Sequence, residues 1–266
     1  MARLAILAGN GDLPLRLAGL RADAVQICFS GVQHVLGRDA EEHAFEKMGA
    51  LFAALKDKGV SEVVMAGAMS RPPLDPTAFD DVMTALAPRL LAAMQGGDDA
   101  LLRLVVEIFE EQGFKVLGAH EVDPELTVCA GLLAGAPLSD HSLKDAERAI
   151  DILSALGPLD VGQGAVVENG LCLGIETLQG TDALLGFVAQ TPKTLRKGGG
   201  VFVKAPKRGQ DLRVDMPTIG PNTVKAAAAA GLSAIVLAAD AVIILAQDET
   251  LSLAQAAGIT LIAQDF

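Results

Sequence analysis

Short apolar runs alternate along the first half of the chain with longer segments in which apolar residues recur at helical spacing. Such runs predict buried strands at residues 4–8, 24–29, 62–66 and 114–118. The helical spacing predicts helices that begin near residue 13 and that span 45–58, 80–93 and 100–112. Gly96, Gly97, Asp98 and Asp99 are expected to cap the last of these helices. Regular alternation of strand and helix is typical of a Rossmann-like parallel sheet.

The second half of the chain predicts another α/β domain. The clearest hairpin signal is Asn169-Gly170 between apolar runs at 161–167 and 171–176. A helix should open just after it, with Thr181 or Asp182 as its N-cap. Further strands are expected at 201–203, 234–237, 242–245 and 259–263, and further helices at 142–155, 223–230 and 251–257.

A stretch with little periodicity separates the two halves. Residues 122–137 are rich in proline, glycine and alanine, which favours a domain boundary. We therefore expect an N-terminal domain over 1–125, a linker over 126–138 and a C-terminal domain over 139–266. The expected fold class is α/β, with an N-terminal Rossmann-like parallel sheet and a second α/β domain.

Composition excludes several kinds of partner. The chain has 266 residues with 21 basic and 33 acidic side chains, a formal net charge of −12, and neither Trp nor Tyr. An acidic chain with few aromatic side chains lacks both the attraction and the stacking surfaces that nucleic acids require, so no nucleic-acid partner is expected. Any anion must be bound by locally placed positive charge.

The cysteines indicate a reducing compartment, and the apolar runs indicate neither a signal peptide nor a membrane span. The three cysteines, Cys28, Cys129 and Cys172, are far apart, and Cys28 and Cys172 lie in apolar runs, so buried reduced thiols are expected rather than a disulfide or a zinc site. The apolar run at the N-terminus is too short for a signal peptide, and Asp240 interrupts the longest run. We expect a cytoplasmic protein that can touch a membrane surface.

A glycine-rich turn follows the first predicted strand. Gly9, Asn10, Gly11 and Asp12 lie between that strand and a helix, an arrangement that cradles phosphate in many nucleotide-binding proteins. Pro14 stands where the dinucleotide fingerprint has its third glycine, so this is not that fingerprint. The alternative interpretation is an ordinary turn.

A second candidate loop follows the strand predicted at 62–66. It carries Ser70 and Arg71, and open α/β sheets bind ligands at the carboxyl ends of their strands. The alternative is a surface loop after a core strand.

The stretch from residue 198 to 223 concentrates charge between two glycine- or proline-rich turns. Lys204, Lys207 and Arg208 gather positive charge around Pro206 and Gly209. These breakers argue against a helix and favour an extended chain.

Asp211, Arg213 and Asp215 then alternate, so an extended chain would place them on one face. That face suits a phosphorylated substrate and magnesium, because arginine binds phosphate oxygens and magnesium prefers hard carboxylate oxygens. The alternative is a solvated edge strand with a ladder of ion pairs.

Two neighbouring features can add to this site. Glu176 and Asp182 can direct carboxylates to the site of Asp215, although helix capping is the simpler role for Asp182. The helix expected at 223–230 follows Pro221, and the amides at its start can hold a phosphate.

Six segments together resemble one family. In chain order they are GNGDLP, GAMSRP, GDD, GTDALL, KAPKRGQDLRVDMPTIGPNT and GITLIA. This set resembles the UDP-2,3-diacylglucosamine pyrophosphatases of lipid A biosynthesis, of the magnesium-dependent type that is unrelated to the calcineurin-like metallophosphoesterases. The resemblance extends over nearly the whole chain.

The resemblance implies an activity and its partners. It implies hydrolysis of UDP-2,3-diacylglucosamine to UMP and 2,3-diacylglucosamine 1-phosphate (lipid X) with Mg²⁺ as cofactor. It also implies two α/β domains with the lipid between them, a homodimer, and a cytoplasmic location with peripheral contact to the inner membrane.

The resemblance also suggests residues for the site. Asp215, in the pattern D-x-P-x-x-G, is the expected catalytic residue and a metal ligand, with Asp182 and Asp211 as further metal ligands. The expected substrate-binding residues are Gly9, Asn10, Gly11, Asp12, Ser70, Arg71, Thr181, Lys204, Arg213, Asn222 and Thr223.

Two other classes of function remain open at this point. One is a nucleotide-sugar-modifying enzyme such as an epimerase or dehydrogenase, which the missing third glycine disfavours. The other is a non-catalytic carrier of lipid or nucleotide sugar, which would need a cleft but no metal.

Overall fold

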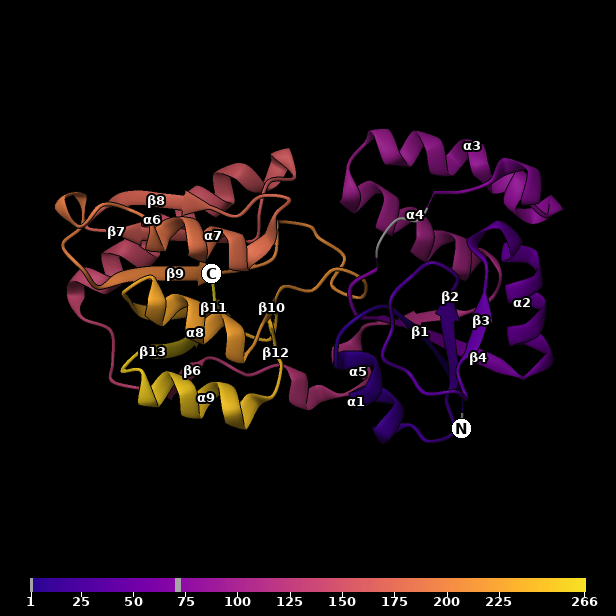
Figure 1. Cartoon of the computed structure of the whole chain (residues 1–266), viewed down its shortest axis with the longest axis horizontal. Helices are drawn as coiled ribbons and strands as arrows, with labels where there is room; N and C mark the ends of the chain where they lie inside the picture. Colours follow the sequence, from indigo (N-terminus) through magenta and orange to yellow (C-terminus); the bar gives the residue numbers. More distant parts are fainter. Residues whose placement is uncertain (1, 70–72) are drawn as a thin grey trace. The chain divides into compact units, whose positions relative to one another are not determined.

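The computed structural model describes residues 2–69 and 73–266, and these form two compact units (Figure 1). Unit 1 is the chain up to Pro124 together with Arg213–Asp215, and unit 2 is Glu125–Leu212 together with Met216–Phe266. Three residues from the range that we assigned to the C-terminal domain therefore group with the N-terminal unit.

Unit 1 contains a five-stranded sheet in which every pair of neighbours is parallel. Its order is β3-β2-β1-β4-β5, which confirms the predicted Rossmann-like arrangement. The strand β3 was not predicted, because its three residues are Glu-Glu-His and carry no apolar run. The strands are β1 (Arg3–Ala8), β2 (Val25–Phe29), β3 (Glu41–His43), β4 (Val60–Ala66) and β5 (Lys115–Leu117).

Helices cover this sheet because its strands are apolar on both faces. In β1, Ala5 and Leu7 belong to a core cluster shared with helices α2, α3 and α4, and the alternate residues Leu4 and Ile6, which face the other side of the sheet, are also fully buried. Burial on both faces is typical of parallel sheets. The helices are α1 (Leu13–Leu20), α2 (Met48–Asp57), α3 (Asp81–Gln95), α4 (Asp98–Glu111) and α5 (Ala119–Val122), with 3-10 turns at Phe45–Lys47, Pro76–Ala78 and Pro124–Leu126.

Helix α4 begins two residues earlier than predicted. Gly97 is its N-cap, with φ of 102°, and the side chains of Asp98 and Asp99 lie in the first turn instead of capping it. Both carboxylates still lie near the positive end of the helix dipole, where negative charge is favourable.

Unit 2 contains a six-stranded mixed sheet of order β6-β13-β11-β9-β7-β8. The three central strands β13, β11 and β9 are parallel, and β6, β7 and β8 are antiparallel to their neighbours. A separate pair, β10 with β12, is parallel. The strands are β6 (Gly131–Ala134), β7 (Gly164–Glu168), β8 (Leu171–Ile175), β9 (Gly200–Lys204), β10 (Thr218–Ile219), β11 (Leu232–Ala238), β12 (Ile243–Ile244) and β13 (Thr260–Gln264).

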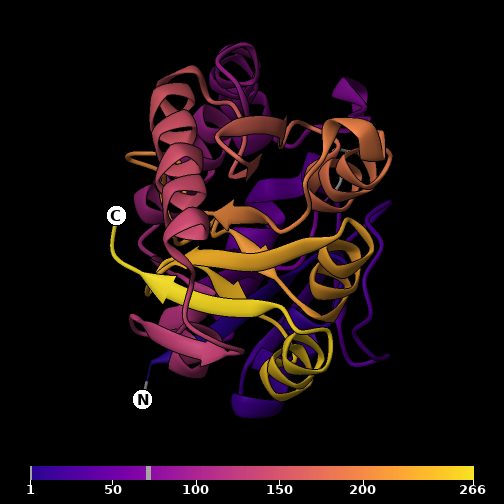
Figure 2. The same cartoon turned by 90° about the vertical axis from the view of Figure 1, so that its left-hand side faces the viewer.

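Figure 2 looks onto unit 2 and shows α6 on one side of this sheet and α7, α8 and α9 on the other. The predicted second α/β domain is therefore confirmed. Within residues 2–69 and 73–266, no helix is long and apolar enough to cross a bilayer. The helices are α6 (Asp140–Leu156), α7 (Gly180–Ala189), α8 (Pro221–Ala229) and α9 (Gln247–Ala256), with 3-10 turns at Gly157–Leu159 and Lys193–Leu195.

Three local features of unit 2 bear on the sequence predictions. The hairpin is confirmed, because Asn169 and Gly170 both have positive φ, as a two-residue turn requires. The strand β6 lies inside the stretch expected to be a linker. The expected N-cap of α7 is wrong, because Gln179 occupies that position and makes no side-chain capping bond.

The three cysteines are free, but only Cys28 is buried, so the expectation of buried thiols is wrong for Cys129 and Cys172. Cys172 lies on β8, the outermost strand of the sheet, which leaves its side chain exposed. Burial raises the pKa of the Cys28 thiol and so favours its protonated form.

A buried ion pair closes the end of unit 2 where β9 begins. Glu168 is 3% exposed and accepts hydrogen bonds from the Arg196 guanidinium and from the amides of Lys197 and Gly198. Burial opposes ionisation of Glu168, but these donors outweigh it and lower its pKa below the usual 4.5. The pair fixes the loop between α7 and β9 to the end of the hairpin.

Candidate functional site

In unit 1, the loops after β1 and β4 meet where the strand order of the sheet reverses. The amide of Asn10 donates to the carbonyl of Ala68 at 2.7 Å, and the amide of Ala68 donates back to Asn10 at 2.8 Å. Such a reversal is where open α/β sheets bind ligands. The predicted residues Gly9, Asn10, Gly11 and Asp12 lie between β1 and α1, at this reversal.

Glycine is required at two positions of this loop pair. A Cβ at Gly9 would lie 2.4 Å from the Ala68 carbonyl oxygen, and one at Gly67 would lie 2.6 Å from that of Asn10. Gly67 also has φ of +86°, which side chains rarely adopt. These glycines let the two backbones touch.

The other residues of the turn face open space. Gly11 has φ of +102°, and nothing lies within 4 Å of the position its Cβ would take. The Asn10 side-chain oxygen accepts from the Gly11 amide at 2.9 Å, and Asp12 is exposed at the N-cap of α1 without a side-chain capping bond. The predicted Ser70 and Arg71 lie outside the described residues.

The extended chain predicted for residues 211–215 is wrong. Leu212, Arg213 and Val214 form a turn, so the three charged residues do not share the face of a strand. The physical reason is that Val214 packs against the core of unit 1, and Arg213 forms an ion pair with Glu110 at 2.7 Å. An apolar residue between two charges thus decides the local conformation.

A histidine that the sequence analysis did not select lies beside this segment. A Cβ on Gly118 would lie 2.4 Å from Cε1 of His120 and 3.2 Å from Cα of Arg213, so glycine allows the three residues to approach. The buried Nδ1 of His120 has no hydrogen-bond partner within residues 2–69 and 73–266. The sequence carried a signal for His120, because this residue follows the strand predicted at 114–118. Ser70 and Arg71 were selected on the same ground, since they follow the strand predicted at 62–66.

In unit 2, the structure brings Lys204, Glu176 and Thr181 together. Lys204 ends β9, and its ammonium donates to the two carboxylate oxygens of Glu176 at 2.9 and 2.6 Å and to the Thr181 hydroxyl at 2.9 Å. The Thr181 hydroxyl in turn donates to Glu176 at 2.9 Å. Lys204 and Glu176 are only 2% and 7% exposed, so the ion pair compensates two buried charges.

The predicted metal ligands are distributed over both units. Asp182 is exposed in the first turn of α7, Asp211 is half-buried in unit 2, and Asp215 is half-buried in the segment that groups with unit 1. Among the residues that the structure describes, no three His, Cys, Asp or Glu side chains are grouped as ligands of one metal ion.

The start of α8 carries the last two predicted residues. Thr223 is buried, and its hydroxyl accepts from the Gly220 amide at 3.2 Å, so it acts as a cap inside the fold. Asn222 is exposed in the first turn. Of the two, Asn222 has the side chain available to a ligand.

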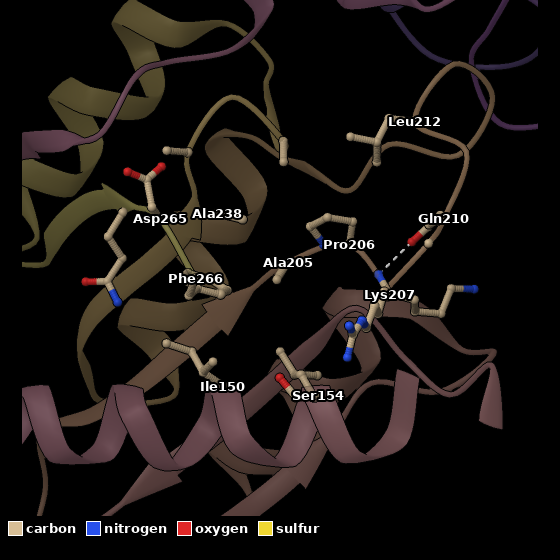
Figure 3. A pocket seen from close by; sticks show the side chains of 16 residues that line it. Ile150, Ser154, Ala205, Pro206, Lys207, Gln210, Leu212, Ala238, Asp265 and Phe266 are labelled. Atoms are coloured by element: carbon tan, nitrogen blue, oxygen red, sulfur yellow. Dashed lines mark hydrogen bonds between the residues drawn. The ribbon is translucent and has the colours of Figure 1, made fainter. Parts of the chain in front are cut away.

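Unit 2 also contains a pocket of about 570 Å³ at the carboxyl ends of β9, β11 and β13 (Figure 3). The loops that follow these strands form one wall, and α6 contributes the other through Ile150, Leu153 and Ser154. The remaining lining residues are Ala205, Pro206, Lys207, Arg208, Gly209, Gln210, Leu212, Ala238, Ala239, Ala241, Gln264, Asp265 and Phe266.

Two open α/β sheets with shaped loops at the carboxyl ends of their parallel strands define a protein of the ligand-binding α/β class. The chain belongs to the LpxI family, because the LpxI N-terminal domain matches residues 3–126 and the LpxI C-terminal domain matches residues 129–262. It is 40% identical over 246 residues to the UDP-2,3-diacylglucosamine pyrophosphatase LpxI of Caulobacter vibrioides, covering 89% of this chain and 88% of that protein. These matches confirm the resemblance seen in the six sequence segments.

Proposed function

We propose that the protein hydrolyses the pyrophosphate of UDP-2,3-diacylglucosamine to UMP and 2,3-diacylglucosamine 1-phosphate (lipid X), a step of lipid A biosynthesis. The observation that carries this proposal is the 40% identity to the Caulobacter pyrophosphatase over nearly the full length of both chains. The enzyme is accordingly a hydrolase that acts on a phosphoanhydride.

The reaction sets clear demands on the chain. Water attacks one phosphorus, the bond from that phosphorus to the bridging oxygen breaks, and two phosphate monoesters leave with more negative charge than the substrate had. A protein with net charge −12 must offset this charge locally. Arg213 is proposed to contribute, and Lys204 is proposed to act with Thr181 beside it.

The ion pair with Glu176 refines the role of Lys204. Its ammonium has both carboxylate oxygens of Glu176 as partners, so much of its charge is compensated before any substrate arrives. A phosphate would therefore meet a polar, nearly neutral cluster held in one geometry. Such pre-organised groups orient a substrate without reorganising during the reaction.

Asp215 is proposed as the catalytic residue, to position the attacking water or to hold the metal. Its carboxylate follows the turn at residues 212–214, whose conformation is fixed by the packing of Val214 against the core of unit 1. A rigid neighbour on the chain restricts where the carboxylate can point, as the alignment of a water molecule with a phosphorus requires.

Magnesium is the proposed cofactor, with Asp215, Asp182 and Asp211 as its ligands. All three are carboxylates, whose hard oxygens Mg²⁺ prefers, although among the described residues they are not grouped around one position. When bound, Mg²⁺ would neutralise phosphate charge and lower the pKa of a bound water. Titration with Mn²⁺ followed by electron paramagnetic resonance tests this directly: Asp215→Asn should bind Mn²⁺ more weakly than the wild type, and equal affinity would contradict the assignment.

A homodimer, a cytoplasmic location and peripheral contact with the inner membrane complete the proposal. A diacylated substrate resides in a membrane, which supports surface contact. Leu178, 91% exposed just before α7, offers an apolar side chain for it. Light scattering tests the dimer, and flotation with phospholipid vesicles tests the contact.

The decisive experiment is incubation with UDP-2,3-diacylglucosamine in Mg²⁺, followed by detection of UMP and lipid X. We expect both products in equal amounts, with EDTA stopping the reaction and Mg²⁺ restoring it. A carrier would bind the substrate and release no UMP, and a nucleotide-sugar-modifying enzyme would leave the pyrophosphate intact. Either result would refute the proposed hydrolysis.

A further inference from the structure

The edge strands of the two large sheets differ in how they are protected from pairing with another chain. Among the residues that the structure describes, these strands are β3 and β5 in unit 1 and β6 and β8 in unit 2. The edges of unit 1 have three residues each and carry charge, with Glu41 and Glu42 on β3 and Lys115 on β5. Short length and charge are usual means of protecting an edge.

The strand β8 has neither protection. Its five residues, Leu-Cys-Leu-Gly-Ile, are uncharged, and Leu171 is 63% exposed. Figure 1 shows β8 at the upper edge of unit 2, and no strand within residues 2–69 and 73–266 pairs with its outer side. The opposite edge strand β6 is shorter, and the amide of Gly135 that follows it donates to the Gln255 side chain.

Helix α7 extends the surface of β8. A Cβ on Gly174 would lie 2.6 Å from Cδ1 of Leu184 and 3.7 Å from Cδ1 of Phe187, so glycine lets the helix lie directly against the strand. The Phe187 side chain is 65% exposed beside it. Strand and helix therefore form one continuous apolar surface.

This surface carries little charge. From Leu171 to Gln190 the charged residues are Glu176 and Asp182, two of 20 residues, whereas 20% of the whole chain is charged. Glu176 is buried and already paired with Lys204. Two copies of a chain with net charge −12 repel each other wherever acidic residues meet, so they can approach most easily where charge is absent.

We propose that a second copy of this chain binds on the surface formed by β8 and α7, an inference that rests on the homodimer of the proposed function. A two-fold axis places each element opposite its own copy, and two copies of β8 then run antiparallel. The outward backbone groups of β8 gain partners, and the Phe187 rings supply the apolar centre that protein interfaces have.

A β-bulge limits how much of this contact can be strand pairing. Cys172 and Gly174 are opposite the adjacent residues Val167 and Val166 of β7, so Leu173 between them is the extra residue. A bulge twists an edge strand and leaves few of its residues in regular register. Side-chain packing must therefore contribute most of the affinity, and the large exposed ring of Phe187 is the natural anchor.

The competing occupant is the membrane surface, because Leu178 lies just before α7 in the chain. Burial in hydrocarbon would leave the outward backbone groups of β8 without hydrogen-bond partners, and open sheet edges do not occur there. A chain of net charge −12 is also repelled by anionic lipids. A second copy supplies both apolar side chains and backbone partners.

The first test compares the two exposed thiols, Cys172 on β8 and Cys129 before β6. The full chain is treated with a maleimide above and below the concentration at which light scattering shows the dimer to dissociate, and labelled peptides are quantified by mass spectrometry. In the dimer Cys172 should lose most of its reactivity while Cys129 keeps it, and dilution should restore Cys172. A dimer in which Cys172 reacts as it does in the monomer would overturn the proposed surface.

The second test places charge on the surface. Phe187→Glu should raise the dimer dissociation constant by about tenfold or more and make Cys172 reactive. Leu159→Glu is the matched control, because Leu159 is 70% exposed on the turn after α6, the helix on the opposite side of the sheet (Figure 2). It should leave the constant unchanged. Equal dissociation constants for Phe187→Glu and the wild type would contradict the proposal, and the labelling of the wild type depends on no variant.

Failure of the proposed function gives a different result. A dimer with protected Cys172 that releases no UMP from UDP-2,3-diacylglucosamine would refute hydrolysis and retain the interface. A wild type that hydrolyses the substrate but is monomeric at every concentration would retain hydrolysis and refute the interface. Protection of Cys172 that appears only when phospholipid vesicles are added would assign the surface to the membrane and overturn the proposal.

Discussion

At the carboxyl ends of their parallel strands, the two sheets carry different chemical groups. In unit 1, the edge at the reversal of strand order is made of backbone, where Gly9 and Gly67 let two loops exchange hydrogen bonds. In unit 2, the corresponding edge is made of side chains, with the buried Lys204 cluster and the polar walls of the pocket. Both edges follow parallel strands of an open sheet.

The difference between the two edges shows how ligand selectivity depends on whether backbone or side chains form the binding surface. Backbone amides at a strand end favour any anion, because they offer dipoles without distinguishing what carries the charge. Side chains of different kinds, placed around a cavity, distinguish one ligand from another. In unit 1 the amides of Asn10, Gly11 and Ala68 already donate within the loops, whereas the edge of unit 2 carries side chains of several kinds, which suit selective recognition.

The largest effect should come from Asp215, which lies in the short segment that groups with unit 1. Asp215→Ala should lower kcat by at least about 10³-fold and change KM little, because it removes a group that acts in the transition state. Steady-state kinetics with UDP-2,3-diacylglucosamine measures this. Glu147→Ala, at an exposed carboxylate on α6, is the control and should keep full activity. Wild-type kcat in Asp215→Ala would remove the residue from the mechanism.

The next effect tests the side-chain edge of unit 2. Lys204→Met should destabilise the protein by about 3–5 kcal/mol, because it leaves the Glu176 carboxylate buried without its counter-charge. The double variant Lys204→Met/Glu176→Met should recover most of that loss. Urea unfolding measures both, with Lys193→Met as the control at an exposed lysine. A double variant no more stable than Lys204→Met would show that the two charges do not compensate each other.

The opposite end of unit 2 should respond to pH through Glu168. Its pKa is lowered in the folded protein, so its contribution to stability is present above the unfolded value of about 4.5 and is lost as pH falls through the folded value. Glu168→Gln should cost about 2 kcal/mol at pH 7, and the difference from wild type should shrink below pH 4.5. Unfolding free energies at a series of pH values measure it, and a pH-independent difference would contradict the ionised pair.

The smallest effect tests the backbone edge of unit 1. Gly9→Ala should destabilise the protein by about 1–2 kcal/mol, because the new Cβ would lie against the Ala68 carbonyl and force the loops apart. Gly19→Ala in α1 is the control, since nothing lies within 4 Å of its Cβ position, and it should be neutral or slightly stabilising. Thermal unfolding compares them, and equal stability of the two variants would mean that the loop contact is not tight.

The strands and helices could be predicted because their signals are local. Apolar runs marked β1, β2, β4 and β9, and the Asn169-Gly170 turn marked the hairpin. The strand β3 was not predicted, because Glu41 and Glu42 show no strand pattern in the sequence and are a strand only through their pairing with β2. The edges of a sheet are thus the hardest part to find from sequence.

The site was harder to predict because its geometry depends on contacts between distant residues. The alternation Asp211, Arg213, Asp215 favoured an extended chain, but Val214 packs into a core some hundred positions away in the sequence and produces a turn. The sequence pattern around Thr181 is that of a helix N-cap, yet the Thr181 hydroxyl bonds to Glu176 and Lys204. Local rules report what a residue can do, and long-range packing selects among those options.

The grouping of Arg213–Asp215 with unit 1 has a consequence for synthesis. A ribosome completes residues 1–124 first, but Val214, which belongs to the packing of that unit, and Arg213, the partner of Glu110, emerge roughly 90 residues later. At a translation rate of about 5–20 residues per second, that is a delay of roughly 5 to 20 seconds. The growing N-terminal unit must pass this interval with part of its apolar surface uncovered, and its last contacts form only after much of the second sheet has been made.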